Sequence, residues 1–270
     1  MGIRVILVGC GNMGHAMLVG WLSSGQLNGS EIAVVEPDAA LRERAAKAGV
    51  ATHETAEGPG AEKPDLVIFA VKPQVMGDVV PAYRRFAPNA TFLSVAAGTP
   101  IATFEKLLGT DAAIVRCMPN TPAAIGKGMM VTVANGNVPE KTKAFVANLL
   151  SASGEVAEIP DENLMDAVTA VSGSGPAYVF HFIECLAKAG ETAGLPVDVA
   201  KLLAMQTVYG AGCLAAASDD EPGELRRQVT SPNGTTAAAL SVFMDEGRLE
   251  TLVADAVEAA RVRSAELGKG

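Results

Sequence analysis

The stretch Ile6–Gly14, ILVGCGNMG, decides the fold of the first half of the chain. It contains the pattern G-x-G-x-x-G, which follows an apolar, β-rich run and opens a helical one. In that context Gly9 allows a tight turn, Gly11 lets the backbone approach a pyrophosphate, and Gly14 permits close packing of helix on strand. The free N–H groups at the start of the helix attract phosphate groups. The stretch therefore predicts a dinucleotide-binding site, with a plain strand–helix turn as the alternative.

An acidic residue lies where such a site needs one. Glu36 lies 22 residues beyond Gly14, at the end of the next predicted strand. A carboxylate there accepts hydrogen bonds from ribose hydroxyls and repels a 2′-phosphate, which favours NADH over NADPH. Arg42 and Arg44 follow on the next predicted helix and are able to accommodate that phosphate instead. The expected cofactor is therefore NADH or NADPH, with NADH slightly favoured.

Residues 1–160 alternate β-rich runs with helical patterns. Apolar strands separated by helices imply parallel βαβ units, in which helices cover both faces of the sheet. The predicted strands are Ile3–Gly9, Glu31–Glu36, Asp65–Val71, Thr91–Val95, Ala113–Cys117, Met129–Ala134 and Glu155–Ile159, and the predicted helices are His15–Leu22, Ala39–Ala48, Ile101–Leu108 and Glu140–Leu150. The expected fold class is α/β, with a Rossmann-type, doubly wound and mostly parallel sheet.

Three loops of small and prolyl residues follow predicted strands: AVKPQ, SVAAG and RCMPNTP. The carboxyl ends of parallel strands form the edge at which open α/β sheets bind ligands, although each loop alone also suits ordinary turn chemistry. Lys72 is as compatible with neutralising a phosphate as with a solvated position. With the glycine loop, these segments supply the candidate cofactor-binding residues Val8, Gly9, Cys10, Gly11, Asn12, Met13, Glu36, Ala70, Val71, Lys72, Pro73, Ala97, Met118, Pro119 and Asn120.

After Pro160 the β-rich runs stop and long helical patterns follow, namely Ala177–Ala193, Val197–Ala217, Thr235–Glu246 and Leu249–Leu267. The stretch Val199–Ala217 is nearly all apolar or small, and a helix that is apolar on every side must be buried by neighbours. Because residues 161–270 offer few such neighbours, we expect a homodimer through these helices; a self-contained bundle is the alternative. The expected domains are residues 1–160 for the dinucleotide and residues 161–270, all-α, for substrate binding and dimerisation.

The composition argues against several classes of protein. Of 270 residues, 49% are hydrophobic, yet no run approaches about 18 uninterrupted apolar residues, so a membrane span is not expected. The net charge is −9 without a cluster of Lys or Arg, which argues against nucleic-acid binding. No secretory signal pattern is apparent at the N-terminus. The four cysteines lack metal-ligand spacing and suggest reduced thiols in a cytoplasmic protein, and His15, His53 and His181 fall in no metal or catalytic motif.

Five segments in this order, ILVGCGNMG, FAVKP, RCMPNTP, AVSGSGPAYVF and PGELRRQVTSPNGTTAAALSVFMD, closely resemble the Δ1-pyrroline-5-carboxylate reductases. The resemblance covers essentially the whole chain, and the SGSGPAY and SPxGTT segments are specific to that family. It implies that NAD(P)H reduces the cyclic imine 1-pyrroline-5-carboxylate to L-proline, in the last step of proline biosynthesis. Members of the family often form larger homo-oligomeric rings.

The resemblance further implies where the substrate binds. The turn Ser231–Thr236 would grip the carboxylate through main-chain N–H groups at a helix N-terminus and through the Ser231 hydroxyl. The Thr236 hydroxyl would orient the ring nitrogen and help to deliver a proton. The implied substrate-binding residues are Ser231, Gly234, Thr235, Thr236 and Glu162, of which Thr236 and Glu162 are the catalytic candidates. Gln228 joins the cofactor-binding residues, and Ser172–Pro176 is the helix start that closes the pocket.

Two positions depart from the family pattern or allow another interpretation. Asn233 stands where the family usually has a second Gly, and at positive φ Asn is the least costly replacement. Glu162 aligns with an acidic residue near the substrate and could assist protonation, but a solvated carboxylate at a helix start is nearly as good an interpretation. Without the resemblance, simple helix capping by Thr235 or Thr236 would explain the turn equally well.

Two other functions fit parts of the pattern. A β-hydroxyacid dehydrogenase pairs the same kinds of domain but relies on a Lys in the central helix, and Pro176–Lys188 offers none before Lys188. A non-catalytic dinucleotide-binding protein would keep the fold without the chemistry. The presence of Ser231, Thr235 and Thr236 argues against that second function.

Overall fold

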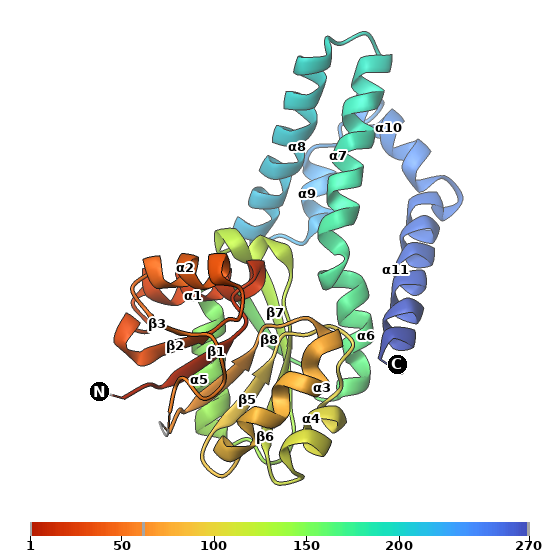
Figure 1. Ribbon diagram of the computed structural model, residues 1–270. Helices are drawn as coiled ribbons and strands as arrows, with labels where there is room; N and C mark the ends of the chain where they lie inside the picture. Colours follow the sequence, from red (N-terminus) through yellow and green to blue (C-terminus); the bar gives the residue numbers. More distant parts are fainter. Residues whose placement is uncertain (1, 61–62, 269–270) are drawn as a thin grey trace. The chain divides into compact units, whose positions relative to one another are not determined.

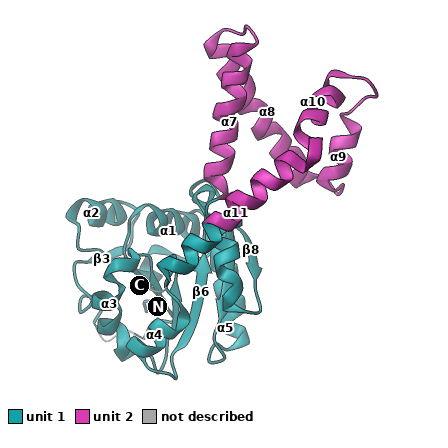
Figure 2. Cartoon of the chain, turned by 90° about the vertical axis from the view of Figure 1, so that its right-hand side faces the viewer, with its two compact units in different colours: residues 1–174, 260–270 teal, residues 175–259 magenta. Residues whose placement is uncertain are grey.

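The computed structural model describes residues 2–60 and 63–268, and the chain divides into two compact units (Figure 1, Figure 2). Unit 1 comprises residues 1–174 and 260–270, and unit 2 comprises residues 175–259. The first boundary lies beyond the expected domain limit at residue 160, because Met165 and Ala170 are buried within unit 1. The C-terminal residues also return to unit 1.

Unit 1 is built around one eight-stranded sheet with the strand order β3-β2-β1-β4-β5-β6-β7-β8. The strands are β1 Val5–Val8, β2 Ile32–Val35, β3 Ala51–His53, β4 Leu66–Phe69, β5 Thr91–Ser94, β6 Ala113–Met118, β7 Gly128–Ala134 and β8 Gly154–Glu158. Neighbouring strands are parallel except β6 and β7, which pair antiparallel. The expected Rossmann-type, mostly parallel sheet is confirmed, and β3 is a strand that the sequence patterns did not predict.

Helices cover both faces of this sheet. They are α1 Asn12–Ser24, α2 Ala39–Lys47, α3 Met76–Val79, α4 Ile101–Leu108, α5 Glu140–Ser151 and α6 Met165–Val168, with the 3-10 segments η1 Gly29–Glu31, η2 Pro73–Val75, η3 Val80–Phe86, η4 Thr121–Ile125 and η5 Glu162–Leu164 and the π-helical turn η6 Thr169–Gly173. Val5 and Leu7 of β1 belong to the core under α1, α2 and α5, whereas Ile6 and Val8 belong to the core under η3 and α4. Burial on both faces explains why β1, β2 and β4 are continuous apolar runs.

Large side chains fill both cores. The Trp21 ring of α1 is fully buried, and its Nε1 donates to the Leu149 carbonyl of α5 at 3.0 Å. On the opposite face, the Phe69 ring stacks with those of Phe92 and Phe104 at centroid distances of 6.0 and 5.9 Å. Such aromatic pairs add about 0.5–1.5 kcal/mol beyond the burial of their area. Unit 1 therefore has a complete core of its own, which holds the carboxyl ends of its strands in fixed register.

Unit 2 is helical and buries far less of its apolar surface. Its elements are α7 Gly175–Thr192, α8 Val197–Ala217, α9 Pro222–Gln228, α10 Thr235–Met244, η7 Asp245–Gly247 and the first part of α11 Arg248–Leu267. α7 and α8 lie side by side (Figure 1), and a Cβ added at Gly190 of α7 would lie 3.3 Å from Cβ of Ala200 of α8. Large apolar side chains such as Phe180, Leu202 and Tyr209 are 59%, 67% and 64% exposed.

The length and apolar composition of α8 raise the question of a membrane span. Among the residues that the structure describes, it is the one helix whose length and composition would allow it to cross a bilayer. Length and composition do not distinguish a membrane span from a helix that packs against another protein chain, since both require a broad apolar surface. Whether α8 crosses a bilayer or packs against another chain therefore has to be judged from the other features of unit 2.

Candidate active site

The glycine loop has the geometry that its sequence predicts. Gly9 has φ +89°, and a Cβ there would lie 2.7 Å from the Val71 side chain and 3.0 Å from the Ala70 backbone. A Cβ at Gly14 would collide with the Gly9 carbonyl. A Cβ at Gly11, by contrast, would meet no atom within 4 Å among the described residues. Two of the three glycines are therefore required by the protein's own packing, and the third leaves the backbone open to the close approach of a phosphate.

The helix behind the loop is suited to anions. α1 begins at Asn12 with Gly11 as its N-cap, and no side chain caps its N–H groups or adds acid to its first turn. Uncapped N–H groups and the positive end of the helix dipole both favour a pyrophosphate. An open cavity of about 860 Å³ is lined by α1 and η4 and includes Asn12, Met13 and Arg44. The residues present at this loop thus fit a dinucleotide.

Glu36 is held against the glycine loop rather than free in solvent. Its side chain is buried, its Oε2 accepts from the Cys10 N–H at 2.7 Å, and its Oε1 accepts from the Asp38 N–H at 3.0 Å. These bonds fix the carboxylate at the carboxyl end of β2, beside the first turn of α1. A carboxylate accepts up to about four hydrogen bonds, so both oxygens keep acceptor capacity for ribose hydroxyls.

The two arginines near Glu36 are bonded to the protein backbone. Arg42 Nη1 donates to the carbonyls of Glu36 and Pro37 at 2.8 and 2.9 Å. Arg44 Nη2 donates to the carbonyls of Cys10 and Gly11 at 2.6 and 3.1 Å. Arg44 therefore braces the glycine loop, a role that the sequence did not suggest.

Ionisation around the loop follows from burial. Desolvation raises the pKa of the Cys10 thiol to about 11, and the Arg44 charge opposes this only in part. Burial lowers the pKa of His15, and the charge of Arg44 lowers it further. Both groups are consequently neutral at pH 7 and add no charge of their own to the glycine loop.

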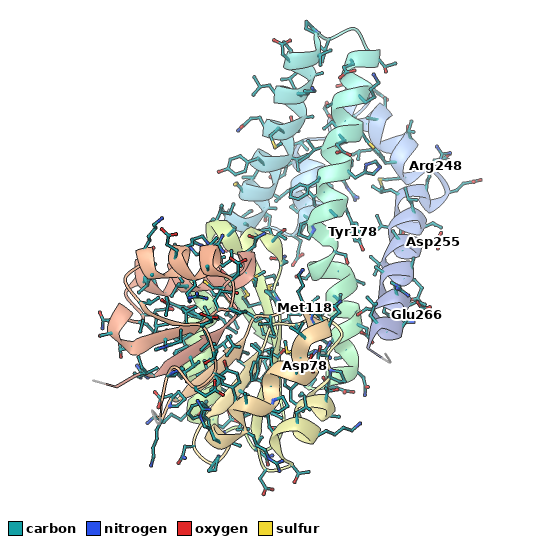
Figure 3. All side chains as sticks on the ribbon, viewed as in Figure 1. Asp78, Met118, Tyr178, Arg248, Asp255 and Glu266 are labelled. Atoms are coloured by element: carbon teal, nitrogen blue, oxygen red, sulfur yellow. The ribbon has the colours of Figure 1, made fainter. Side chains whose placement is uncertain are left out.

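The strand register brings the other cofactor candidates to one edge. Val8 of β1 pairs with Phe69 of β4, Phe69 with Ser94 of β5, and Ser94 with Arg116 of β6. The segments after these strands therefore emerge side by side, and they contain Ala70, Val71, Lys72, Pro73, Ala97, Met118, Pro119 and Asn120. Lys72 and Ala97 are exposed, whereas Met118 and Pro119 are buried (Met118 in Figure 3). The structure thus gathers the predicted cofactor residues of unit 1 at the carboxyl edge of the sheet.

Asn120 links this edge to the SGSGP segment. Its Nδ2 donates to the Ser172 carbonyl and hydroxyl at 3.2 and 3.3 Å, and its Oδ1 accepts from the Met129 N–H at 2.9 Å. A Cβ at Gly173 would lie 2.8 Å from Met118 Cε. Ser172 and Gly173 lie in the π-helical turn η6, a type of turn frequent at functional sites. Ser172 and Gly173 are therefore packed tightly onto the RCMPN segment.

Glu162 makes contacts that neither sequence interpretation anticipated. Its Oε1 accepts from Arg116 Nη1 at 2.9 Å and from the Ile101 N–H at the start of α4, also at 2.9 Å. The Arg116 side chain is 7% exposed and that of Glu162 is 28% exposed, so the arginine end of the ion pair is largely removed from water. Breaking a buried pair leaves an uncompensated charge and typically costs about 3–5 kcal/mol. The sequence did carry one signal for Arg116, a cation inside the apolar run of β6.

The SPNGTT turn in unit 2 has the predicted backbone. Asn233 has φ +59°, so Asn occupies the left-handed conformation expected for the family's Gly. The Gly234 N–H donates to the Ser231 carbonyl at 3.0 Å, and a Cβ at Gly234 would lie 2.5 Å from Ser231 Oγ. A side chain larger than hydrogen at position 234 would therefore displace the Ser231 hydroxyl.

The turn leads directly into α10. Gly234 is its N-cap, and Thr235 and Thr236 are its first two residues, without a side-chain cap or an acidic residue in the first turn. Simple capping by Thr235 or Thr236 is thus wrong as an explanation of these threonines. Gln228, predicted near the cofactor, donates from Nε2 to Asp220 Oδ2 at 2.8 Å within unit 2. Among the described residues, no group of three or more metal-type ligands occurs.

Comparison with known proteins identifies the family. Residues 162–267 match the family described as pyrroline-5-carboxylate reductase dimerisation, and residues 4–98 match the family described as NADP oxidoreductase, coenzyme F420-dependent. The pyrroline-5-carboxylate reductase of Pseudomonas aeruginosa is 41% identical over 98% of this chain and 97% of its own length. The enzymes of Arabidopsis thaliana and Escherichia coli are 38% and 35% identical, each over 98% of this chain and over 96% and 98% of their own.

Solved structures agree with the sequence matches. The pyrroline-5-carboxylate reductase of Coxiella burnetii superposes with a TM-score of 0.93 at 33% identity, with both chains fully covered. The Plasmodium falciparum pyrroline carboxylate reductase with NADP bound gives 0.84 at 30% identity and covers 98% of each chain. Prephenate dehydrogenase from A. aeolicus shares the fold alone, with a TM-score of 0.55 at 13% identity. With a nicotinamide-dinucleotide site in unit 1 and relatives of this identity over its whole length, the chain belongs to the pyrroline-5-carboxylate reductase family.

Proposed function

We propose that this protein reduces 1-pyrroline-5-carboxylate to L-proline with a reduced nicotinamide dinucleotide, as the last step of proline biosynthesis. The observation that carries this proposal is the turn Ser231–Thr236, whose left-handed Asn233 and side-chain-free Gly234 leave uncapped N–H groups at the start of α10. A site of this kind binds a carboxylate without a cationic side chain. A substrate with one carboxylate and few other polar groups suits it.

In this proposal the turn supplies binding and orientation. The N–H groups of Thr235 and Thr236 donate to the substrate carboxylate, and the Ser231 hydroxyl adds a third donor. Gly234 keeps that hydroxyl in place, because any side chain there would lie against it. The Thr236 hydroxyl contacts the ring nitrogen, which fixes the face of the ring that receives the hydride and gives the nitrogen a route for its proton.

The residues of unit 1 hold the cofactor and place its reactive carbon. The glycine loop and α1 hold the pyrophosphate, Glu36 the adenosine ribose, and the loops Ala70–Pro73 and Met118–Asn120 the nicotinamide end. The dinucleotide supplies the hydride, so strong acid catalysis by the protein is unnecessary once the imine is protonated. Positioning alone, at about 3–3.5 Å between reacting carbons, then accounts for much of the rate.

Glu162 is better suited to positioning than to proton donation. Both its bond to Arg116 and its bond to the Ile101 N–H use the same oxygen, and they join the RCMPN strand to the loop before α4. A Glu162→Gln variant keeps the acceptor but removes the charge. A pH profile of kcat that stays unchanged in this variant supports positioning, whereas loss of an ionisation from the profile supports the acid role.

For the cofactor we propose a preference for NADH. Glu36 holds a buried carboxylate at the carboxyl end of β2, where it would repel a 2′-phosphate. Arg42 and Arg44 donate to backbone carbonyls, and Arg42 also pairs with Glu54. The test is kcat/KM with NADH and with NADPH in the wild-type protein and in Glu36→Ser. We expect the wild type to favour NADH and the variant to shift towards NADPH by about tenfold or more. A strong NADPH advantage in the wild type would reverse the proposal.

We also propose that unit 2 forms a homodimer, with larger homo-oligomers built from it, in the cytoplasm. The exposed apolar residues of α7 and α8 and the match of residues 162–267 to a dimerisation family support a second copy, rather than lipid, as the cover of α8. Light scattering should give at least twice the monomer mass without detergent. A monomer that binds vesicles would contradict this.

The experiment of greatest value is an absorbance assay of NADH and NADPH consumption with pyrroline-5-carboxylate. Imine-dependent oxidation of the cofactor supports the proposal. Reduction of NAD(P) by a β-hydroxyacid, without imine activity, would point to the dehydrogenase class instead. Cofactor binding without turnover of either substrate would point to a non-catalytic dinucleotide-binding protein.

A further inference from the structure

The C-terminal end of α11 packs onto unit 1 through a polar contact. Ser264 is the buried residue of this helix, at 5% exposure, although most of α11 is exposed. Its Oγ donates to Asp166 Oδ1 of α6 at 2.7 Å. A hydrogen bond from a buried hydroxyl to a carboxylate is stronger than one between two neutral groups. Removal of the hydroxyl leaves the carboxylate oxygen without this donor. The contact therefore fixes the last turns of α11 on α6.

The same turns lie against the loop between β5 and α4. Gly98 in this loop has φ +70°, and a Cβ built there would lie 3.6 Å from Cβ and from the carbonyl carbon of Leu267. The Gly268 N–H donates to the Ser264 carbonyl at 3.1 Å, so the helical turn continues to this contact. A Cβ at Gly268 would in turn lie 3.4 Å from the Gly98 carbonyl oxygen. The end of α11 thus covers Gly98. This residue follows Ala97, which is a candidate for the nicotinamide end of the site.

The C-terminal end of this loop is held by the segment Glu162–Asp166, which also contacts α11. Glu162 accepts from the Ile101 N–H, directly after the loop, and from Arg116 of β6. Asp166 follows Glu162 by one helical turn and accepts from Ser264. A cavity of about 220 Å³ between these groups is lined by Gly98, Pro100, Arg116, Glu162, Asn163, Asp166, Ala265 and Gly268. The segment Glu162–Asp166 therefore connects the β5–α4 loop and the RCMPN segment to the end of α11.

We propose that Ser264 is a positioning residue for the reductase reaction: through Asp166 and the Leu267–Gly98 contact it fixes the Val95–Pro100 loop that supports the reduced nicotinamide ring. This inference rests on the function proposed above. Ser264 touches neither substrate nor cofactor and acts through the loop. Since a displacement of about 1 Å at the reacting carbons costs up to about a hundredfold in rate, a small movement of the loop is enough to be measured.

The test compares Ser264→Ala with Ser264→Thr, which keeps the hydroxyl. The control is Glu266→Gln on the same turn, where Glu266 pairs with Arg263 at 2.7 Å on the exposed side of α11 (Glu266 in Figure 3). We expect Ser264→Ala to lower kcat for imine reduction about three- to tenfold, with the KM for the imine nearly unchanged, as loss of one positioning hydrogen bond implies. Threonine should restore most of the rate, and the control should match the wild type.

A second readout separates positioning from loss of folded protein. With cofactor deuterated at the transferred position, the isotope effect on kcat should rise in Ser264→Ala, because hydride transfer becomes slower. A smaller fraction of folded enzyme would lower kcat and leave the isotope effect unchanged, which would overturn the inference. If Ser264→Ala does not fold, Leu267→Gly, which removes the Cβ that faces Gly98, should give the same change in smaller size, and wild-type behaviour there overturns the inference.

The two proposals fail in distinguishable ways. If the wild-type protein does not reduce the imine, the proposed function fails and this inference with it. If the wild type reduces the imine and Ser264→Ala has the same kcat and isotope effect, only the positioning role of Ser264 is removed.

Discussion

Unit 1 and unit 2 bury their apolar side chains in different ways. In unit 1 the rings of Trp21, Phe69 and Phe92 are fully buried, so the sheet and its helices form a core within one chain. In unit 2, Leu202 and Tyr209 are 67% and 64% exposed, and its buried apolar residues are small alanines. A monomer rarely leaves so much contiguous apolar surface uncovered. Unit 1 is therefore complete as a folding unit, whereas unit 2 requires a partner surface.

The largest expected effect tests this difference in burial. Phe69→Ala removes a ring stacked between two others in unit 1 and should lower the free energy of unfolding by about 3–5 kcal/mol at any protein concentration. The matched variant is Phe180→Ala on the exposed side of α7. Phe180→Ala should lower stability only by weakening the association of subunits. The melting temperature of this variant should therefore depend on protein concentration. Equal, concentration-independent losses for both would contradict the distinction.

The next effect tests the glycine loop apart from the stability of unit 1. Gly11→Ala introduces a methyl group that meets no described atom within 4 Å, so the melting temperature should stay close to that of the wild type. The same methyl group blocks the approach of a pyrophosphate, and the dissociation constant for NADH should rise about ten- to hundredfold, which is about 1.4–2.8 kcal/mol. Fluorescence titration measures it. Gly14→Ala, which collides with the Gly9 carbonyl, should instead lose stability and binding together.

A comparable effect is expected in the turn Ser231–Thr236 of unit 2, the proposed substrate site. Thr236→Ala should lower kcat/KM for the imine at least about tenfold, or about 1.4 kcal/mol, with the dissociation constant for NADH nearly unchanged. The matched hydroxyl is that of Thr230, which donates to the Arg226 carbonyl at 2.6 Å within its own helical turn. Thr230→Ala should have little effect on turnover. Wild-type kinetics for Thr236→Ala would remove its proposed role.

The smallest effect concerns the cysteines, two in each unit. Burial raises the pKa of Cys10 to about 11 and that of Cys117 to about 12, so both thiols should resist thiol reagents at neutral pH until the protein unfolds. Cys185 and Cys213 are exposed in unit 2 and should react first, more slowly as protein concentration rises and subunits associate. Early labelling of Cys10 or Cys117, identified by peptide mass, would show that unit 1 opens more readily than its core implies.

The buried thiols also give unit 1 a stability that depends on pH. Because their folded pKa values lie above the ordinary 9.0, the folded state keeps protons that the unfolded state releases. The stability associated with these protons is complete below pH 9 and falls as pH rises through about 11. Cys10→Ser should reduce this alkaline loss, as measured by denaturant unfolding across that range.

Local patterns located most strands and helices of the chain, but not all of them. β1, β2 and β4 are short apolar runs buried on both faces, and such runs are recognisable without knowledge of their neighbours. β3, Ala51–His53, has no such pattern, since it is a partly exposed edge strand defined by its pairing with β2. Its existence depends on hydrogen bonds between distant residues, which no local window contains.

The sequence by itself determined the dinucleotide fold, the glycine loop and the backbone of the Ser231–Thr236 turn. Each depends on backbone conformations that only particular residues adopt, as Gly9 and Asn233 do at positive φ. Only the tertiary structure decided that Glu162 pairs with Arg116, that Arg44 braces the glycine loop and that Ser264 meets Asp166. A polar side chain is compatible with many partners, and which one it meets depends on how segments far apart in the chain pack together.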